Sequence, residues 1–250
     1  MPKKKYSLSL QEVQVPIREP VIKFGGQPVW LTEPQWPLSS LIGIPMQFIA
    51  QIPLYSELFG PLQAQMAYVF MTDLFMKGEV RAGRTVATEN PDRGENAVIL
   101  QPGIWTGPTL PLTAGPTLYK YPDISCEYAV ELHPGEDADA LASPWPDPFE
   151  GDLNEEEEDE DYLGEGDPDR QTAWDLRWEA FHEDKIGGIP VPAPNYDAFP
   201  YPGQGKWQLI LQFAEDTEGM RYEINFGGNG VGYALLSEDG RNGRFLWMRP

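Results

Sequence analysis

The stretch KFGGQPVW at residues 23–30 recurs as KIGGIPVP at residues 185–192, an offset of 162 positions. Downstream, MQFIAQI at residues 46–52 matches WQLILQF at residues 207–213, at the nearly equal offset of 161. Two separate blocks therefore keep almost the same spacing and the same order. We infer that one supersecondary unit has been duplicated, with too few copies for a solenoid.

Both copies of the second block alternate with a period of two, which predicts β-strands. The alternation places Gln47, Ile49 and Gln51 on one face of the first strand, opposite residues 46, 48, 50 and 52. It places Gln208, Ile210 and Gln212 on the corresponding face of the second strand. Apart from the glutamines, each strand is apolar enough to lie inside the protein.

Other patterns predict further elements. We expect strands at residues 97–101, 127–132, 222–226, 231–236 and 245–248. We expect short helices at residues 55–65 and 172–181, with Thr172 as the N-cap of the second. The chain also contains 26 Pro and 25 Gly, a composition typical of short elements joined by many turns.

These elements predict an α+β fold that is β-rich, with antiparallel sheets built from a duplicated strand-turn-strand unit and few short helices. We expect residues 1–132 to form the first half and residues 171–250 the second half, packed together as one body. Residues 133–170 are acidic and rich in Pro, which predicts a flexible insertion between the halves.

The charge is unevenly distributed. The net charge is −21, and the twelve acidic residues between positions 150 and 169 account for more than half of it. The rest of the chain, at about −9, is still acidic. Such a surface repels phosphate backbones and disfavours nucleic acid, whereas a basic protein partner is electrostatically permitted.

The sequence also bears on the compartment. No apolar run approaches the ~20 residues that span a bilayer, so we expect no membrane segment. Cys126 is the only cysteine, which excludes an internal disulfide and fits a reducing compartment. We therefore expect a cytoplasmic protein.

Catalytic and cofactor motifs are scarce. Only His133 and His182 are available for acid–base or metal chemistry, and no HExxH or paired-cysteine spacing occurs. The Gly-rich residues 228–232 are followed by a predicted strand, so we interpret them as a hairpin turn and not as a phosphate loop. We predict no cofactor, no metal and no catalytic residue, although catalysis by a pair of carboxylates stays open.

The glutamines of the repeated strands are the main candidate site residues. A buried amide needs hydrogen-bond partners, so Gln47, Gln51, Gln208 and Gln212 are interpreted structurally, as ties between the Gly-Gly turns and the sheet. The alternative is functional: the glutamines line a ligand-binding cleft between the halves. The stacking surfaces of that cleft would be Trp30, Trp36 and Trp207.

The repeated motifs resemble a known family. The Gly-Gly-x-Pro turn at residues 25–28, the Trp-Pro pair at 36–37 and PMQFIAQ at 45–51 are similar to the signature of the YwqG-like bacterial proteins of unknown function. Residues 207–212, with the later Phe-Gly and Gly-Tyr pairs, are similar to that family's C-terminal half. The resemblance implies a duplicated, antiparallel fold. It supplies no catalytic residues, and it suggests toxin–immunity gene neighbourhoods by association only.

The sequence favours binding over catalysis. The first hypothesis is a non-catalytic binding protein for a basic protein partner, such as an immunity-type inhibitor of a bacterial toxin. The second is a small-ligand-binding protein or enzyme that uses the cleft between the halves. A purely structural scaffold ranks third, because the chain holds no repeat array. Oligomeric state cannot be inferred from these patterns.

Overall fold

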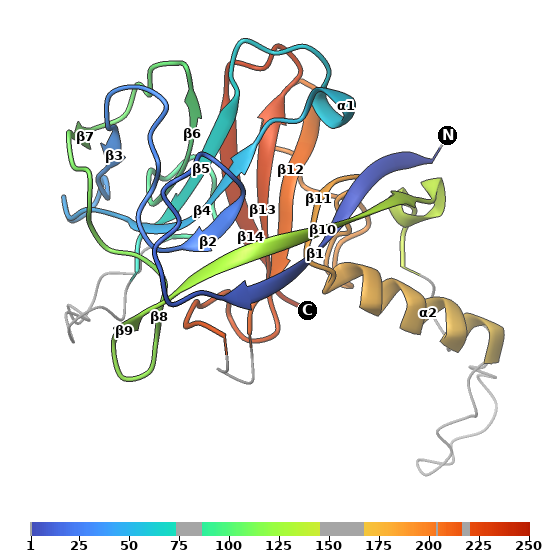
Figure 1. Cartoon of the computed structure of the whole chain (residues 1–250). Coiled ribbons are helices and arrows are strands. Elements are labelled where there is room, and N and C mark those ends of the chain that lie inside the picture. Colours follow the sequence, from blue (N-terminus) through green and yellow to red (C-terminus); the bar gives the residue numbers. More distant parts are fainter. Residues whose placement is uncertain (1, 74–86, 146–167, 204, 217–220) are drawn as a thin grey trace.

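The computed structural model describes residues 2–73, 87–145, 168–203, 205–216 and 221–250. Its main feature is a ten-stranded sheet in which every adjacent pair of strands is antiparallel (Figure 1). The order along the sheet is β14-β13-β12-β11-β1-β10-β2-β4-β5-β6. The protein is therefore a β-rich α+β fold, which confirms the predicted fold class.

The strand order is symmetric about the centre of the sheet. One end holds the first-half strands β2 (Lys23–Gly25), β4 (Gln47–Pro53), β5 (Met66–Met71) and β6 (Asn96–Gln101). The other end holds the second-half strands β11 (Lys185–Gly187), β12 (Trp207–Ala214), β13 (Val231–Ser237) and β14 (Gly243–Met248). Each half thus repeats one order of four strands, as the two matching sequence blocks lead one to expect.

Two long strands join the halves. They are β1 (Lys3–Glu12) and β10 (Glu127–Asp137), which pair from Lys3 opposite Asp137 to Glu12 opposite Tyr128. In Figure 1 they run side by side across the lower part of the molecule. β2 pairs with β10, and β11 pairs with β1. The sheet therefore bends at this central pair, and its two ends face each other.

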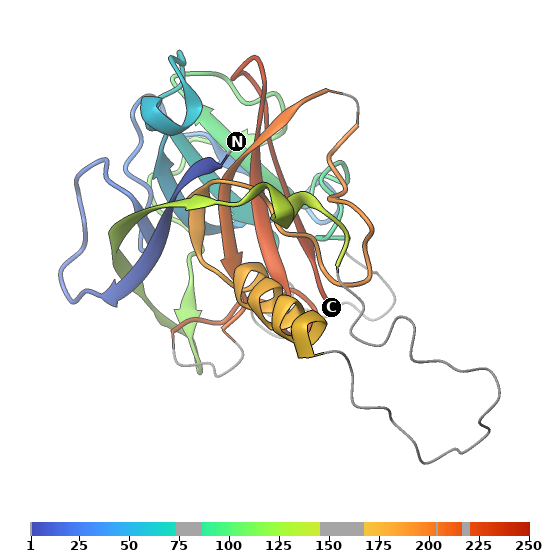
Figure 2. The ribbon, with the colours of Figure 1, turned by 90° about the vertical axis from the view of Figure 1, so that its right-hand side faces the viewer.

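The smaller elements lie outside this sheet. They are β3 (Trp36–Pro37) with β7 (Thr109–Leu110), β8 (Tyr119–Lys120) with β9 (Ile124–Ser125), helices α1 (Ser56–Phe59) and α2 (Pro168–Phe181), and a 3₁₀ turn at Asp139–Ala142. Figure 2 shows α2 in front of the second-half strands. Neither α-helix in the described ranges has the length and apolar character that crossing a membrane requires.

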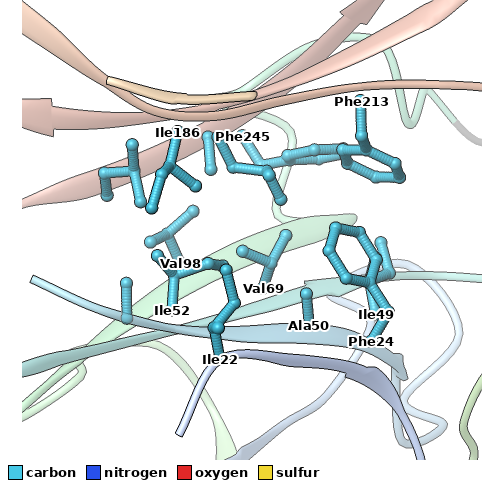
Figure 3. Packing of buried hydrophobic residues seen from close by; sticks show 14 of the residues in the cluster. Ile22, Phe24, Ile49, Ala50, Ile52, Val69, Val98, Ile186, Phe213 and Phe245 are labelled. Atoms are coloured by element: carbon cyan, nitrogen blue, oxygen red, sulfur yellow. The ribbon is translucent and has the colours of Figure 1, made fainter. Parts of the chain in front are cut away.

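The two halves share one hydrophobic interior. Figure 3 shows side chains of the first half, among them Phe24, Ile52 and Val69, facing Phe213 and Phe245 of the second half. At the open edges of the sheet, β6 and β14 come into contact. Gly243 makes this approach possible, because a Cβ there would lie 2.6 Å from the Cβ of Val98. Both edge strands are thereby covered, which protects their backbone groups from pairing with other chains.

Each half also carries a second cluster on its outer face. In the first half it is built on Trp36, Phe48, Tyr68 and Phe70. In the second half the cluster contains Phe181 of α2 and buried residues of β12, β13 and β14. The strands of each half are therefore buried on both faces, which explains why β5 and β6 contain no exposed residue.

A β-bulge interrupts each of the repeated strands. The register shifts between Phe48 and Ala50 in β4, and between Leu209 and Leu211 in β12. The extra residue reverses the side-chain direction beyond it. Phe48 therefore joins an outer cluster while Ala50 joins the shared interior. In the second half, Leu209 joins the outer cluster and Leu211 joins the shared interior. The predicted strict alternation along both strands, with one apolar face, is wrong for this reason.

Three further expectations need correction. The helix expected at residues 55–65 is only Ser56–Phe59, because Gly60 has a φ of +75° and Pro61 follows it. The strand expected at 222–226 is reduced to a single bridge between Glu223 and Tyr119. The helix expected from Thr172 begins at Pro168, so Thr172 lies inside it and is not the N-cap. Proline is well suited to the first turn, where no helical N–H bond is needed.

The flexible insertion expected at residues 133–170 overlaps a strand at its start and a helix at its end. β10 continues through Asp137, which is only 1% exposed, so the expected boundary at 132 falls inside a strand. At the other end, α2 begins at Pro168. Most of the acidic run, at residues 146–167, lies outside the described residues.

Candidate functional site

Two of the four candidate glutamines hold the Gly-Gly-x-Pro turns to the sheet. Gln51 Oε1 accepts the N–H of Val29 at 2.8 Å, and its Nε2 donates to the carbonyl of Val21 at 2.7 Å. In the second half, Gln212 Oε1 accepts the N–H of Val191 at 3.0 Å, and its Nε2 donates to the carbonyl of Ala180 at 2.8 Å. Both amides are fully buried. The geometry therefore matches the structural interpretation for this pair.

A tyrosine hydroxyl also bonds to each Gly-Gly-x-Pro turn. Tyr68 donates its hydroxyl to the carbonyl of Val29 at 2.8 Å, and Tyr233 donates to the carbonyl of Val191 at 2.6 Å. Burial raises the pKa of both hydroxyls. The two tyrosines occupy equivalent positions in β5 and β13, so each turn is held from two strands.

A buried lysine precedes each Gly-Gly pair. Lys23 Nζ lies 2.6 Å from Glu127, and Lys185 Nζ lies 2.6 Å from Asp137. The two acids stand at opposite ends of β10. Sequence reasoning missed these ion pairs, although the Lys-x-Gly-Gly pattern of both copies was a signal for them. We read them as structural, since both lysines are no more than 1% exposed.

The tryptophan candidates lie on outer faces. Trp30 and Trp36 both pack in the outer cluster of the first half, with ring centroids 6.4 Å apart. Trp207 packs against the outer cluster of the second half and donates its indole N–H to Pro202. The three rings therefore do not line a common cleft between the halves.

The remaining two glutamines differ from each other. Gln47 is 2% exposed and donates through Nε2 to the carbonyl of Thr117 at 3.3 Å. Gln208, at the equivalent position, is half-buried. Because of the bulges, Gln47 and Gln51 point to opposite faces of their strand, contrary to the prediction that they share one. Of the seven candidate residues, only Gln47 lines a pocket at the junction of the halves.

We call this cavity the interhalf pocket. It has a volume of about 460 Å³. The first half contributes Gln47, Met71, Thr72 and Asp73, the second half contributes Glu215, Glu223, Ile224, Asn225 and Trp247, and Thr88, Glu89 and Tyr119 complete the wall. Tyr119 belongs to β8, which pairs with β9 in the hairpin labelled in Figure 1.

Negative charge dominates the pocket wall. Four carboxylates line it, those of Asp73, Glu89, Glu215 and Glu223, and no Lys, Arg or His is found among its described lining residues. The pKa of Tyr119 is raised, first by burial and then by Asp73 and Glu223, because these charges disfavour a phenolate. No three acidic, histidine or cysteine side chains of the described chain are grouped to hold a metal ion. The wall therefore presents negative charge and hydrogen-bond acceptors to the cavity.

Backbone contacts fix the acidic wall in place. Glu215 accepts the N–H of Gly228 at 3.0 Å, which ties it to the glycine-rich turn. The N–H of Glu223 donates to the carbonyl of Tyr119 at 2.7 Å, and this bond links the two sides of the pocket. The glycine-rich turn leads into β13, with no helix following, so it lacks the helix N-terminus of a phosphate loop.

The histidines have local partners. His133 lies 3.0 Å from the hydroxyl of Ser9, and His182 contacts the carbonyls of Trp178 and Asn229 at 3.0 and 3.2 Å. Neither histidine lines the interhalf pocket. Their contacts are those of hydrogen-bonded structural side chains.

Cys126 is a small buried core residue. It is 4% exposed within the shared interior, and burial raises the pKa of its thiol to about 11. Since the thiolate is the reactive form, we predict that a thiol reagent at pH 8 labels the native protein roughly 100-fold more slowly than the urea-unfolded chain. Absorbance during labelling with a disulfide reagent measures both rates, and equal rates would show that the thiol is accessible.

Neither a protein-family model nor a curated protein matches this chain. The interhalf pocket is the feature of this chain that points to a function. Its acids are scattered along the sequence, at positions 73, 89, 215 and 223, and only the fold brings them together. No motif in the sequence could have identified them.

Proposed function

We propose that this chain is a non-catalytic binding protein that receives a positively charged surface of a protein partner at the interhalf pocket. The observation that carries the proposal is the set of four lining carboxylates with no basic residue among the described lining positions. A concave site lined with charge of one sign focuses the electrostatic field and attracts oppositely charged partners. The net charge of −21 acts in the same direction.

The finer form of the proposal is an immunity-type inhibitor that covers the basic surface of a bacterial toxin. Acidic inhibitors of this kind gain fast, salt-sensitive association from charge complementarity. The similarity of the repeated motifs to YwqG-like proteins supports this form, and membership of that family remains part of the proposal. The single cysteine supports a cytoplasmic location, which we propose as well.

A small-ligand-binding protein or enzyme is the second candidate. The volume of about 460 Å³ favours it, because small-molecule sites commonly measure about 300–1,000 Å³. The pocket lacks histidine, and its acids would have to supply any proton transfer. The two candidates differ in what they bind, so an experiment on partners separates them.

The test is affinity capture from a lysate of the source cells at low and high salt. A double variant, Glu89→Gln with Glu223→Gln, removes two pocket charges. A second double variant, Glu131→Gln with Glu179→Gln, removes two exposed charges outside the pocket and so has the same net charge. We expect a basic protein to be retained at low salt by the wild type and the second variant. The pocket variant should retain at least about fivefold less.

Two results would contradict the proposed function. One is that no protein is retained at either salt concentration. The other is that the two charge-matched variants retain the partner equally, since general acidity would then explain the capture. If a metabolite raises the melting temperature specifically while no protein is captured, the small-ligand candidate is favoured instead.

A further inference from the structure

Gln47 contributes a side-chain amide to the wall of the interhalf pocket. Its Nε2 donates to Thr117. The side chain is 98% buried in the protein and forms part of the pocket wall. An amide oxygen on the wall of a cavity can accept a hydrogen bond from a group bound there. This observation is independent of the acidic side chains.

We propose that the interhalf pocket binds the guanidinium group of an arginine side chain. The inference deepens the proposed function and rests on it in one respect: the arginine would belong to the protein partner. A guanidinium has five N–H donors and no acceptor, and it keeps its charge throughout the physiological range. The pocket offers the complement, an amide oxygen from Gln47 together with carboxylates that accept only.

The two aromatic residues of the wall also suit a planar cation. Trp247 is half-buried, and its Nε1 donates to the hydroxyl of Thr88 at 3.1 Å, which holds the indole ring in one orientation. Tyr119 also lines the pocket, and its carbonyl accepts the N–H of Glu223. A guanidinium stacks on such rings and is more weakly hydrated than an ammonium, so it loses less on entering the pocket.

Apolar side chains provide for the rest of an arginine. Met71 and Ile224 line the pocket together with the polar groups. An arginine buries its three methylene groups against apolar surface while its charged end reaches polar partners. The pocket volume of about 460 Å³ is large enough for the whole side chain. A lysine would match the charge but not the planar arrangement of donors.

Isothermal titration with three small probes tests the assignment. They are Nα-acetyl-arginine amide, Nα-acetyl-lysine amide, and the citrulline analogue, which has the shape of arginine without its charge. We expect the arginine probe to bind with one site per chain. It should bind at least about tenfold more tightly than the citrulline probe, because hydrogen bonds to charged groups are the stronger ones. It should also bind more tightly than the lysine probe.

Matched variants locate the binding. Gln47→Leu removes the amide oxygen from the pocket wall, and Gln208→Leu makes the same change at the equivalent position of the second half, outside the pocket. We expect Gln47→Leu to weaken arginine binding about tenfold and Gln208→Leu to leave it unchanged. Thermal unfolding checks that both variants are folded. Should Gln47→Leu fail to fold, Glu223→Gln replaces it, with an expected weakening of at least about fivefold.

Several outcomes would overturn the inference. They are no binding of the arginine probe at millimolar concentration, equal binding of the citrulline or lysine probe, and undiminished binding by a folded pocket variant. The proposed function fails separately. If a basic partner is captured through the pocket carboxylates but the arginine probe does not bind, the function stands and the guanidinium assignment falls.

Discussion

Replacing Lys185 with Met lowers the free energy of unfolding by about 3 kcal/mol, near the lower end of the range for breaking a buried ion pair. Lys185 is fully buried, and its Nζ lies 2.6 Å from Asp137, which is 1% exposed. The variant leaves the Asp137 charge buried with Lys5 as its remaining cation, at 2.9 Å. Urea unfolding at 25 °C measures the loss. A change below about 1 kcal/mol would show that the ion pair is not needed.

The pH dependence of this loss identifies its origin. Burial by itself would raise the pKa of Asp137, but Lys185 and Lys5 hold it below its ordinary value. A carboxyl with a lowered pKa stabilises the fold above its unfolded pKa, about 3.9, and loses this contribution as pH falls through the folded value. The difference between wild type and Lys185→Met is therefore full at neutral pH and shrinks below about pH 4. A difference that is constant with pH would point to packing instead.

Replacing Gln212 with Leu also costs about 3 kcal/mol, because it leaves several buried backbone groups without partners. Gln212 satisfies the N–H of Val191 and the carbonyls of Ala180, Phe181 and Glu183. Gln212 is fully buried, so its partners lie away from bulk solvent. The same urea measurement gives the loss.

The duplicated chain supplies its own controls for this prediction. Gln51→Leu, at the equivalent position of the first half, should destabilise to a similar degree, since it breaks the bonds to Val29 and Val21. Gln208→Leu, on a half-buried glutamine of the same strand as Gln212, should change stability by less than about 0.5 kcal/mol. If Gln208→Leu cost as much as Gln212→Leu, the turn-anchoring role would be wrong.

The sequence allowed the class of the fold and the main anchors to be predicted because these features are local and repeated. The Gly-Gly turns need backbone angles that glycine provides, and Gly25 and Gly187 have φ of +66° and +71°. The glutamines that bind these turns follow at the same spacing in both copies. A buried amide in an apolar strand then has few possible partners, so the structural interpretation followed from chemistry.

Side-chain directions could not be predicted in the same way. A bulge depends on how a strand pairs with its neighbour, and the alternation in the sequence continues through it without a break. Residues 46–52 therefore predicted a single apolar face, whereas the structure divides their apolar side chains between two clusters. The central strand β1 was missed as well, because its partner β10 lies more than a hundred residues away.

Only part of the candidate site could be predicted from the sequence. Gln47 was singled out as lining a space between the halves, and it does line the interhalf pocket. The acids and Trp247 were not singled out, since each is ordinary in its own sequence context. They meet because the sheet folds over about β1 and β10, and this long-range event leaves no local pattern.

A crystal structure of the protein with Nα-acetyl-arginine amide tests the binding role of the interhalf pocket most directly. We predict that the guanidinium group lies in this pocket, within hydrogen-bonding distance of Gln47 Oε1 and of at least one lining carboxylate. Finding the ligand only elsewhere on the acidic surface, or an empty pocket at saturating concentration, would contradict the account.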